Sequence, residues 1–322
     1  MIRSLARLLV VFLFLPLKLY SQDSGAGLNY QLTVINNPSV TGSEGNGFLR
    51  LSYLNLYPGN NYNLHSVSLS YDGYFSSLHG GAGIYLSNDY LGGIINDLKG
   101  GLSYSYYFKA RRDLFISAGL SASFYHRGIN LSGAILPDQI DPMAGVVIPT
   151  EEALSSRGRT VFDLATGFLF MSGKFFGGIS VVHLAEPNLD DSGYSDQKLK
   201  RRLFIHGAAD FNLSSGKNLK IRPLAKLEIQ EGFLSAGAGS VLESKSLSIN
   251  VILLADNKNN IDLQTGFSII ISSLNIFYNY RFNIASQENL LPFSLLHHAG
   301  IALRLNNVDK RKTVKTINFP KL

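Results

Sequence analysis

Histidines are the side chains of this chain that could carry acid–base or metal chemistry. A lipid-modifying membrane enzyme needs a serine and a histidine, oriented by an Asn or Asp, at one level of its wall. No histidine accompanies a nucleophile motif such as G-x-S-x-G, and the chain has no H-x-x-x-H pair. The most acidic loop, Asn188 to Gln197, lacks the ligand spacing of a calcium site. The sequence therefore predicts a protein that is not an enzyme, with no metal site and no cofactor. The histidines considered are His183, His206, His297 and His298, spread over three predicted strands.

Composition indicates a protein that crosses a membrane with strands. Of its 322 residues, 45% are hydrophobic and only 16% are charged, against about 25% charged residues in soluble domains. Beyond the first 21 residues there is no apolar run of the roughly 20 residues that a spanning helix needs. Only helices and closed barrels satisfy every backbone polar group in lipid, so we expect an all-β outer-membrane barrel.

Residues 1–21 have the pattern of a secretory signal peptide. Arg3 and Arg7 form a positive region, Leu8 to Leu17 an apolar core, and Ser21 a small residue before the expected cleavage. The alternative is a retained N-terminal anchor, for which this apolar core is short. The formal charge of +6 falls to +3 without the three leader cations. No basic run interleaved with aromatic residues is present, so nucleic-acid binding is not predicted.

Alternation of apolar and polar residues dominates the rest of the chain. Leu64 to Asp72, Leu102 to Phe108 and Leu274 to Phe282 each place apolar or aromatic residues on one face and mostly polar residues on the other. A transmembrane barrel needs this pattern, with the apolar face outward. We expect about fourteen antiparallel strands, each close to the 9–11 residues that cross a bilayer. Their centres are near Leu51, Leu69, Ile84, Tyr104, Leu120, Thr166, Val181, Ala208, Ala225, Ala238, Ile252, Gly266, Phe277 and Ala299.

Connections between these strands alternate largely between short and long. Short periplasmic turns and long extracellular loops are typical of such barrels, which places both termini in the periplasm. We expect the loops Asn130 to Arg159 and Ala185 to Arg202 to face outside and to contact partners. In the first of them, Asp141 and Pro142 should fix a turn. Two connections are short although they fall where long extracellular loops are expected, at Gln230 to Gly232 and at Asp256 to Asn260.

Charged residues on the polar faces of the strands are expected to point into the lumen, with positive charge in excess. One interpretation is a porin-like preference for anions. The other is that cross-strand pairs fill and stabilise a barrel narrower than the open porins of 16–18 strands. The residues assigned to the lumen in this way are Arg50, Asp72, Arg222, Lys226, Glu228, Arg281 and Arg304.

The segment before the first strand contains the turn sequence VINNPSVTGS (Val34 to Ser43). Pro38 fixes its own φ and favours an extended Asn37, and Gly42 permits a positive φ. One hypothesis is that this segment occludes the lumen, held by polar wall residues such as Arg222 and Arg281. The other is a solvated periplasmic arm that docks a partner. The expected divisions are a leader 1–21, this segment 22–46, a barrel 47–306 and a periplasmic tail 307–322.

Four motifs follow one another in order: Asn36 to Ser43 before the first strand, Ser87 to Gly93 after the third, and the strands Val161 to Phe170 and Phe175 to Asn188. This ordered set resembles the PorP/SprF family of outer-membrane proteins of the type IX secretion system and gliding machinery. The residues that match the family motifs are Asn37, Pro38, Gly42, Asn88, Asp89, Asp163, His183 and Pro187. The family often ends its last strand with a Ser-His-Glu type motif. The stretch Leu296 to Leu303 departs from that pattern, because it has histidines but no Glu.

The resemblance implies a non-enzymatic component of surface secretion. It implies that the barrel helps to export or anchors secreted surface proteins that carry a type IX C-terminal sorting domain, and that it contacts other subunits of the machinery and outer-membrane lipid. Some relatives carry an added peptidoglycan-binding domain, which this sequence lacks, so direct anchoring to the cell wall is not expected. The alternative function is a fourteen-stranded porin or a channel for hydrophobic solutes.

Overall fold

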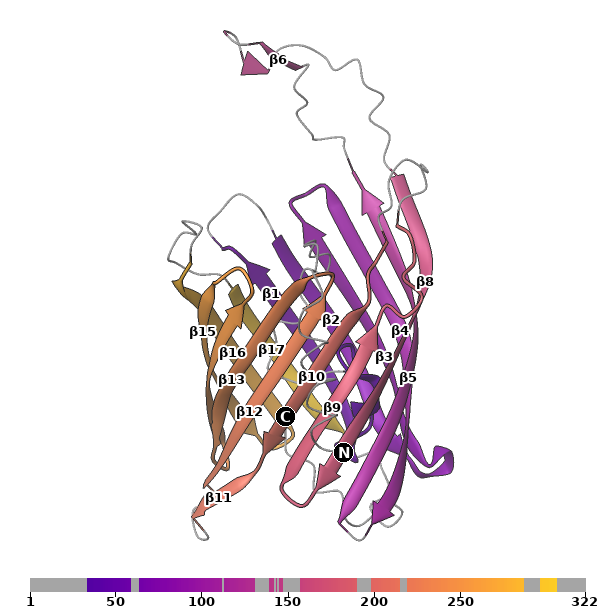
Figure 1. The fold of residues 1–322 in the computed structure, drawn as a ribbon, viewed down its shortest axis with the longest axis vertical. Coiled ribbons are helices and arrows are strands. Elements are labelled where there is room, and N and C mark those ends of the chain that lie inside the picture. The colour runs from indigo at the N-terminus through magenta and orange to yellow at the C-terminus, as the bar shows by residue number, and fades with distance from the viewer. Residues whose placement is uncertain are drawn as a thin grey trace, which may run out of the picture.

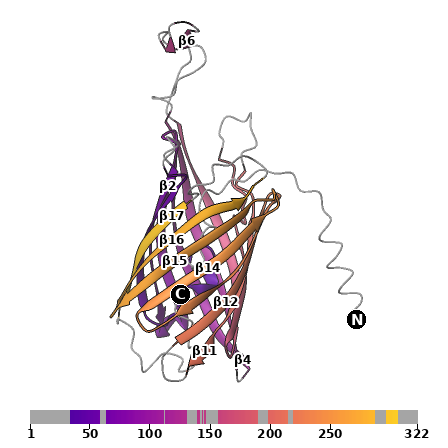
Figure 2. The same cartoon turned by 90° about the vertical axis from the view of Figure 1, so that its left-hand side faces the viewer.

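A computed structural model describes residues 34–58, 64–111, 113–130, 139–141, 143, 145–146, 157–189, 198–214, 219–286 and 296–305. Within these residues, one sheet runs in the order β10-β9-β8-β5-β4-β3-β2-β1-β17-β16-β15-β14-β13-β12-β11, and pairing of β10 with β12 closes it. Strands β10 and β11 both pair with β12 and follow each other along the same line of the wall, interrupted only at Asp210. Counted as one strand, they give the described wall fourteen strands. Figures 1 and 2 show a tube of tilted strands. The predicted antiparallel outer-membrane-type barrel is confirmed.

The strands of the wall follow each other around the barrel mostly in chain order. They are β1 (Gly47–Leu56), β2 (Leu64–Phe75), β3 (Gly80–Leu91), β4 (Ile95–Arg111), β5 (Leu114–Ile129), β8 (Arg157–Ser172), β9 (Phe175–Val182), β10 (Arg202–Ala209), β11 (Phe211–Ser214), β12 (Leu219–Gln230), β13 (Phe233–Glu243), β14 (Leu247–Asp256), β15 (Ile261–Ile271), β16 (Leu274–Ala285) and β17 (Leu296–Leu305). The pair β6 (Ile140–Asp141) and β7 (Gly145–Val146) forms a separate hairpin, and η2 (Pro38–Val40) and η3 (Ser76–Leu78) are short 3-10 helices.

Side-chain alternation explains why these residues form a barrel. Leu69 is 43% exposed on the outer face of β2, whereas the adjacent Ser70 is 5% exposed and points inward. The same inversion recurs in β5, where Leu120 is 65% exposed beside Ser121 at 5%. Apolar residues on the outside and polar residues on the inside are what a bilayer-spanning barrel requires. Each of the fourteen predicted strand centres lies within one wall strand.

Strand lengths differ from the expected 9–11 residues on one side of the barrel. β4, β5 and β8 have 17, 16 and 16 residues, whereas β9 and β10 have 8 each. The stretch Ser87 to Leu91, which we expected to follow the third strand, is the end of β3. The reason is that β3 stays paired with its neighbours to its last residue, where Leu91 lies opposite Leu64 and Ile95.

The two ends of the barrel differ in their connections. We call the end that carries η3 and the turns at 112–113, 173–174, 244–246 and 272–273 the short-turn end, and the opposite end the long-loop end. The long-loop end carries the connections 130–156 and 183–201, and also three short ones, at 92–94, 231–232 and 257–260. The predicted leader 1–21, Pro142 and the tail 307–322 lie outside the described residues.

Candidate functional site: the plugged lumen

Residues 34–46, which we call the plug segment, lie within the barrel. Asn37, Ser39 and Thr41 are each 0% exposed, although none of them belongs to a strand. The helix η2 at the centre of the segment contacts β4, β5 and β8. The segment therefore fills part of the lumen, and its chain continues directly into β1.

Local sequence explains the shape of the plug segment. Asn37 is extended, with a φ of −146°, and its Oδ1 accepts hydrogen bonds from the N–H of Ser39 at 3.0 Å and from Ser39 Oγ at 2.6 Å. An Asn side chain in this position caps the start of a helix. Pro38 suits the first helical position because it has no N–H, and an N–H there would have no partner within the helix. Gly42 then adopts a φ of +69°, which favours glycine and turns the chain toward β1.

Serine hydroxyls of the wall bind main-chain carbonyls of the plug segment. Ser180, Ser117 and Ser105 come from three different strands, and each donates its Oγ–H to one carbonyl oxygen. The pairs are Ser180 with Asn36 (2.6 Å), Ser117 with Ser39 (2.7 Å) and Ser105 with Thr41 (2.6 Å). On β2, the carboxylate of Asp72 accepts the N–H of Gly42 at 2.7 Å. The wall thus satisfies buried backbone groups that no secondary structure pairs.

Glycines of the wall leave the space that the plug segment occupies. A Cβ built on any of three such glycines overlaps an atom of the segment. These overlaps are Gly81 with the carbonyl oxygen of Thr41 (1.9 Å), Gly119 with the carbonyl carbon of Pro38 (2.3 Å) and Gly167 with Oδ1 of Asn37 (2.1 Å). No real Cβ approaches a heavy atom this closely, so wall and plug segment have complementary shapes.

Two further contacts hold the plug segment against the wall. Asn37 donates its Nδ2–H to Nε2 of His206 on β10 at 3.1 Å, which requires a neutral imidazole that carries its proton on Nδ1. Val40, the apolar residue of η2, packs in a small core with Leu169 and Phe204. The segment therefore combines polar contacts with one apolar anchor.

An ion cluster joins the plug segment to the first strands. Arg50 on β1 donates to Glu44 Oε1 at 2.6 Å and to the carboxylate of Asp72. Burial raises the pKa of Glu44, and the charge of Arg50 acts against that increase. Asp72 binds both Arg50 and the N–H of Gly42, so it couples the wall to the turn.

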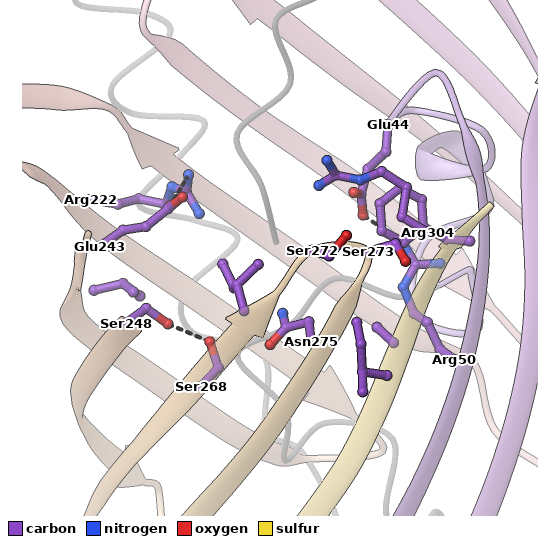
Figure 3. A pocket seen from close by; sticks show the side chains of 15 residues that line it. Glu44, Arg50, Arg222, Glu243, Ser248, Ser268, Ser272, Ser273, Asn275 and Arg304 are labelled. Atoms are coloured by element: carbon purple, nitrogen blue, oxygen red, sulfur yellow. Dashed lines mark hydrogen bonds and ion pairs between the residues drawn. The ribbon is translucent and has the colours of Figure 1, made fainter. Parts of the chain in front are cut away.

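A cavity of about 40 Å³ lies beside the plug segment near the short-turn end. Figure 3 shows Arg304, Arg50 and Glu44 on one side of it and Arg222 with Glu243 on the other. Arg222 bonds Asp210 at 2.6 Å and Glu243 at 3.4 Å. Charges of both signs line the cavity, which favours the interpretation of the lumen charges as paired filling.

The strands opposite the plug segment present a tightly packed polar surface to the lumen. Asn250, Asn279 and Gln264 are each 1% exposed, and His298 is 2% exposed. Asn250 donates to Asn279 at 3.0 Å, and Arg281 donates to Gln264 at 3.2 Å. Asn250 on β14 and Asn279 on β16 therefore bond over the intervening β15, and Arg281 on β16 bonds Gln264 on the adjacent β15.

The predicted lumen cations are buried to different degrees. Arg222, Lys226 and Arg281 are less than 10% exposed, and Arg50 and Arg304 are half-buried. The described hydrogen bonds and ion pairs between wall side chains and residues 34–46 come from Arg50, serines, Asp72, Tyr107 and His206. Short hydroxyl side chains fit this role because the segment lies close against the wall. Contact of Arg222 or Arg281 with residues 22–33, which lie outside the described residues, stays a prediction.

The predicted motif residues occupy both ends of the barrel. Asn37, Pro38 and Gly42 form the plug turn, whereas the others lie toward the long-loop end. Asp163 and His183 come together, with His183 Nδ1 and Asp163 Oδ2 2.6 Å apart and both side chains buried. On β3, Asp89 pairs with Lys99 at 3.0 Å, and the neighbouring Asn88 is half-buried. Asp141 Oδ1 accepts the N–H of Met143 at 2.7 Å.

The connection between β9 and β10 turns into the mouth of the barrel at its described ends. Leu189 and Leu199 are 6% and 0% exposed and pack against Tyr125. The carbonyl of Pro187 accepts the N–H of Leu199 at 2.9 Å. Of the four histidines considered from sequence, His183, His206 and His298 are buried and His297 bonds Tyr278 at 2.5 Å. Whether this connection contacts partners stays a prediction.

Sequence reasoning missed the serines and glycines that hold the plug segment. The signal was present in Leu102 to Phe108, where Ser103 and Ser105 alternate with aromatic residues, but small polar residues on a lumen face do not by themselves indicate a bound segment. Among the described residues, no group of three or more His, Cys, Asp or Glu could hold a metal ion. No helix in the described part of the chain is long and apolar enough to span a membrane.

Comparison with protein families decides the identity. The model of the type IX secretion system membrane protein PorP/SprF matches residues 21–298. This chain belongs to the PorP/SprF family. The PorP/SprF match covers all the wall strands except the end of β17, so the resemblance inferred from the motifs is confirmed. A search among curated proteins found no sequence match.

Comparison with solved structures found similar chains at low sequence identity. The toluene transporter TodX of P. putida is 9% identical, with a TM-score of 0.50 over 85% of this chain and 94% of that chain. The toluene transporter TbuX of Ralstonia pickettii is 12% identical, with a TM-score of 0.47 and coverage of 84% and 90%. A FadL homologue of Pseudomonas aeruginosa is 11% identical, with a TM-score of 0.48 and coverage of 84% and 93%. The similarity to TodX supports the fold alone.

Proposed function

We propose that this PorP/SprF protein is a non-enzymatic outer-membrane scaffold that helps to export or anchors surface proteins carrying a type IX C-terminal sorting domain. The observation that carries the proposal is the plug segment. The plug segment occupies part of the lumen and is bound to the wall through Asn37, Ser39 and Thr41. A lumen filled in this way suits a structural or gated component better than a permanently open pore.

In this proposal, residues 1–21 are a cleaved signal peptide and the short-turn end faces the periplasm. Both termini are then on the side where other subunits of the secretion or gliding machinery would bind, and the long-loop end faces the cell exterior. Loops on a rigid scaffold are where binding usually resides, so the connections at the long-loop end present the surface for the exported protein.

A second candidate function is a channel for small or hydrophobic solutes. The observation that favours it is the fold similarity to the toluene transporter TodX, with a TM-score of 0.50. In that case the plug segment is a gate that a solute or the membrane potential moves.

Two measurements on the full-length protein separate the candidates. Purification from native membranes in mild detergent, followed by mass spectrometry, should recover a large secreted protein with a C-terminal sorting domain. The purified barrel in a planar bilayer should show little steady conductance. A steady open channel that purifies without such a protein would refute the scaffold and support the transporter.

A further inference from the structure

A hollow of about 650 Å³ lies on the outer face of the wall, over β1 to β5 and β8. Leu86, Leu102 and Phe162 are among the side chains that line it, and they are 46%, 64% and 60% exposed. The volume falls within the roughly 300–1,000 Å³ that is usual for small-molecule sites. The hollow is therefore large enough to hold part of a lipid or another small apolar molecule.

Small residues on β4 and β5 create the hollow. Across β3, β4, β5 and β8, four outward residues lie next to one another in the order Leu86, Gly100, Phe124 and Phe162. Gly100 has no side chain, and Ala122, two residues before Phe124, has only a methyl group. A Cβ on Gly100 would lie 2.5 Å from Cε1 of Phe124, so this ring lies over Gly100. The outer face is thus low along β4 and β5, between Leu86 and Phe162.

The hollow lies at the end of the apolar band that is nearest to the long-loop end. On β5, every outward residue from Ile116 to Phe124 is apolar, a span close to the 9–11 residues that cross a bilayer. The next outward residue is His126, whose Nδ1 lies 2.8 Å from Oγ1 of Thr160 on β8. The apolar band of a barrel ends where the lipid headgroups begin. The side of the hollow at Phe124 and Phe162, which we call the rim, is therefore next to the headgroups.

The polar pair beside the rim can bind an oxygen atom of a lipid. If Thr160 donates its hydroxyl to Nδ1 of His126, the proton of the imidazole is on Nε2. A Cβ on Gly158 would lie 3.2 Å from this Nε2, so the missing side chain there leaves room beside it. Nε2 can then donate to a phosphate or an ester oxygen.

Charge at the rim distinguishes between kinds of lipid. Among the described residues, the outward polar side chains beside the rim include Asn88, Asn96, His126 and Thr160, with no Lys or Arg. Strongly anionic headgroups are bound by clusters of Lys and Arg, so they do not match this surface. A zwitterionic phospholipid, which has one phosphate and one ammonium, needs only neutral donors and acceptors.

We propose that the hollow binds one acyl chain of a zwitterionic phospholipid of the outer membrane, with the phosphate or ester groups beside His126. The occupant follows from the apolar lining, from the neutral rim and from the continuity of the hollow with the surface that faces lipid. The proposal goes beyond the proposed function and does not depend on the identity of an exported protein.

Tryptophan fluorescence locates such a lipid, because the chain has no tryptophan of its own. Phe162→Trp places an indole at the hollow, whereas Phe168→Trp places it on the outer face of β8 away from the hollow. The full-length barrel in dodecyl maltoside micelles is titrated with phosphatidylethanolamine that carries brominated acyl chains, which quench indole on contact. We expect half-maximal quenching at a lipid-to-protein ratio about tenfold lower for Phe162→Trp than for Phe168→Trp.

A larger side chain at Ala122 should exclude the lipid. In the Phe162→Trp background, Ala122→Phe fills the hollow from β5. Ala118→Phe is the matched control, because Ala118 is on the same face of β5 but does not line the hollow. Ala122→Phe should raise the ratio at half-maximal quenching about fivefold or more, and Ala118→Phe should leave it unchanged.

Removal of the imidazole tests the headgroup contact separately. In the same background, His126→Leu should raise the ratio at half-maximal quenching about fivefold, through the loss of one hydrogen bond. An unchanged ratio would overturn the contact with His126.

Three other results would overturn the site or its occupant. Equal ratios for Phe162→Trp and Phe168→Trp, or for Ala122→Phe and Ala118→Phe, would show that the hollow contacts lipid no differently from the rest of the wall. Displacement of the brominated lipid by unlabelled lipid A at a lower concentration than by unlabelled phosphatidylethanolamine would exclude the zwitterionic lipid. Weaker quenching of Phe162→Trp than of Phe168→Trp in saturating lipid would show that protein covers the hollow, such as a second copy of the barrel.

Discussion

Asn37 and His206, which are 169 residues apart in the sequence, form a hydrogen bond of 3.1 Å inside the barrel. This contact connects the turn of the plug segment to a wall strand on the far side of the sheet from β1. It also explains why Asn37 occupies this position, since its amide caps η2 with the oxygen and bonds the wall with the nitrogen.

Removal of the Asn37 amide should loosen the plug segment. Asn37→Ala loses a helix cap and a buried hydrogen bond, each worth about 1 kcal/mol, so we expect the ratio of seated to released plug segment to fall by about tenfold or more. The measurement is single-channel conductance of the purified barrel, which should show openings that the wild type lacks. Asn55→Ala, near the opposite end of β1, is the control and should behave as wild type.

A methyl group added to a wall glycine that touches the plug segment should also loosen the plug segment. A Cβ on Gly119 would lie 2.3 Å from the carbonyl carbon of Pro38, whereas a Cβ on Gly207 meets nothing closer than 3.8 Å. Overpacking costs about 1–3 kcal/mol, so Gly119→Ala should raise conductance and Gly207→Ala should leave it unchanged. Equal conductance of the two variants would contradict the packing of the plug segment against β5.

Loss of the Asp72 charge should destabilise the whole protein. Asp72→Asn removes one of the two carboxylates that pair with Arg50, and breaking a buried ion pair costs about 3–5 kcal/mol. The free energy of unfolding in detergent should fall by that order. The double variant Arg50→Gln, Asp72→Asn should lose less stability than the sum of the two single variants, because Arg50 and Asp72 bind each other. A strictly additive double-mutant cycle would show that the two residues do not interact.

Two N-terminal deletions distinguish a plug from a docking arm. Deleting residues 22–45 removes nearly all of the described plug contacts, whereas deleting 22–33 leaves all of them. If the segment is a plug, the longer deletion should produce steady conductance and the shorter one should not. If ion flux stays low after the longer deletion while retention of the exported protein collapses, the segment is a docking element.

Protease accessibility tests the orientation of the barrel. With the partner removed, protease added to intact cells should first cut the connection 130–156, because it is the longest at the long-loop end. The turn at 112–113, on the short-turn end, should be cut only after the outer membrane is permeabilised. Cleavage confined to the 112–113 turn in intact cells would place the short-turn end outside.

The sequence by itself determined the barrel and its strand positions. Each strand must alternate apolar and polar residues to face lipid and lumen. The outward orientation of Leu69 and the inward orientation of Ser70 can therefore be predicted without a structure. The ordered motifs likewise determined the family. The turn at Asn37, Pro38 and Gly42 could be predicted because its chemistry is local.

Only the tertiary structure decided where that turn lies and what holds it. Contacts such as Ser180 with Asn36, or Gly167 with Asn37, join residues more than a hundred positions apart, and their types are common on any lumen face. The excess length of β8 over β9 was hidden for the same reason. Where pairing stops depends on where the neighbouring chain turns away, as it does at His183, and the alternation of side chains continues past that point.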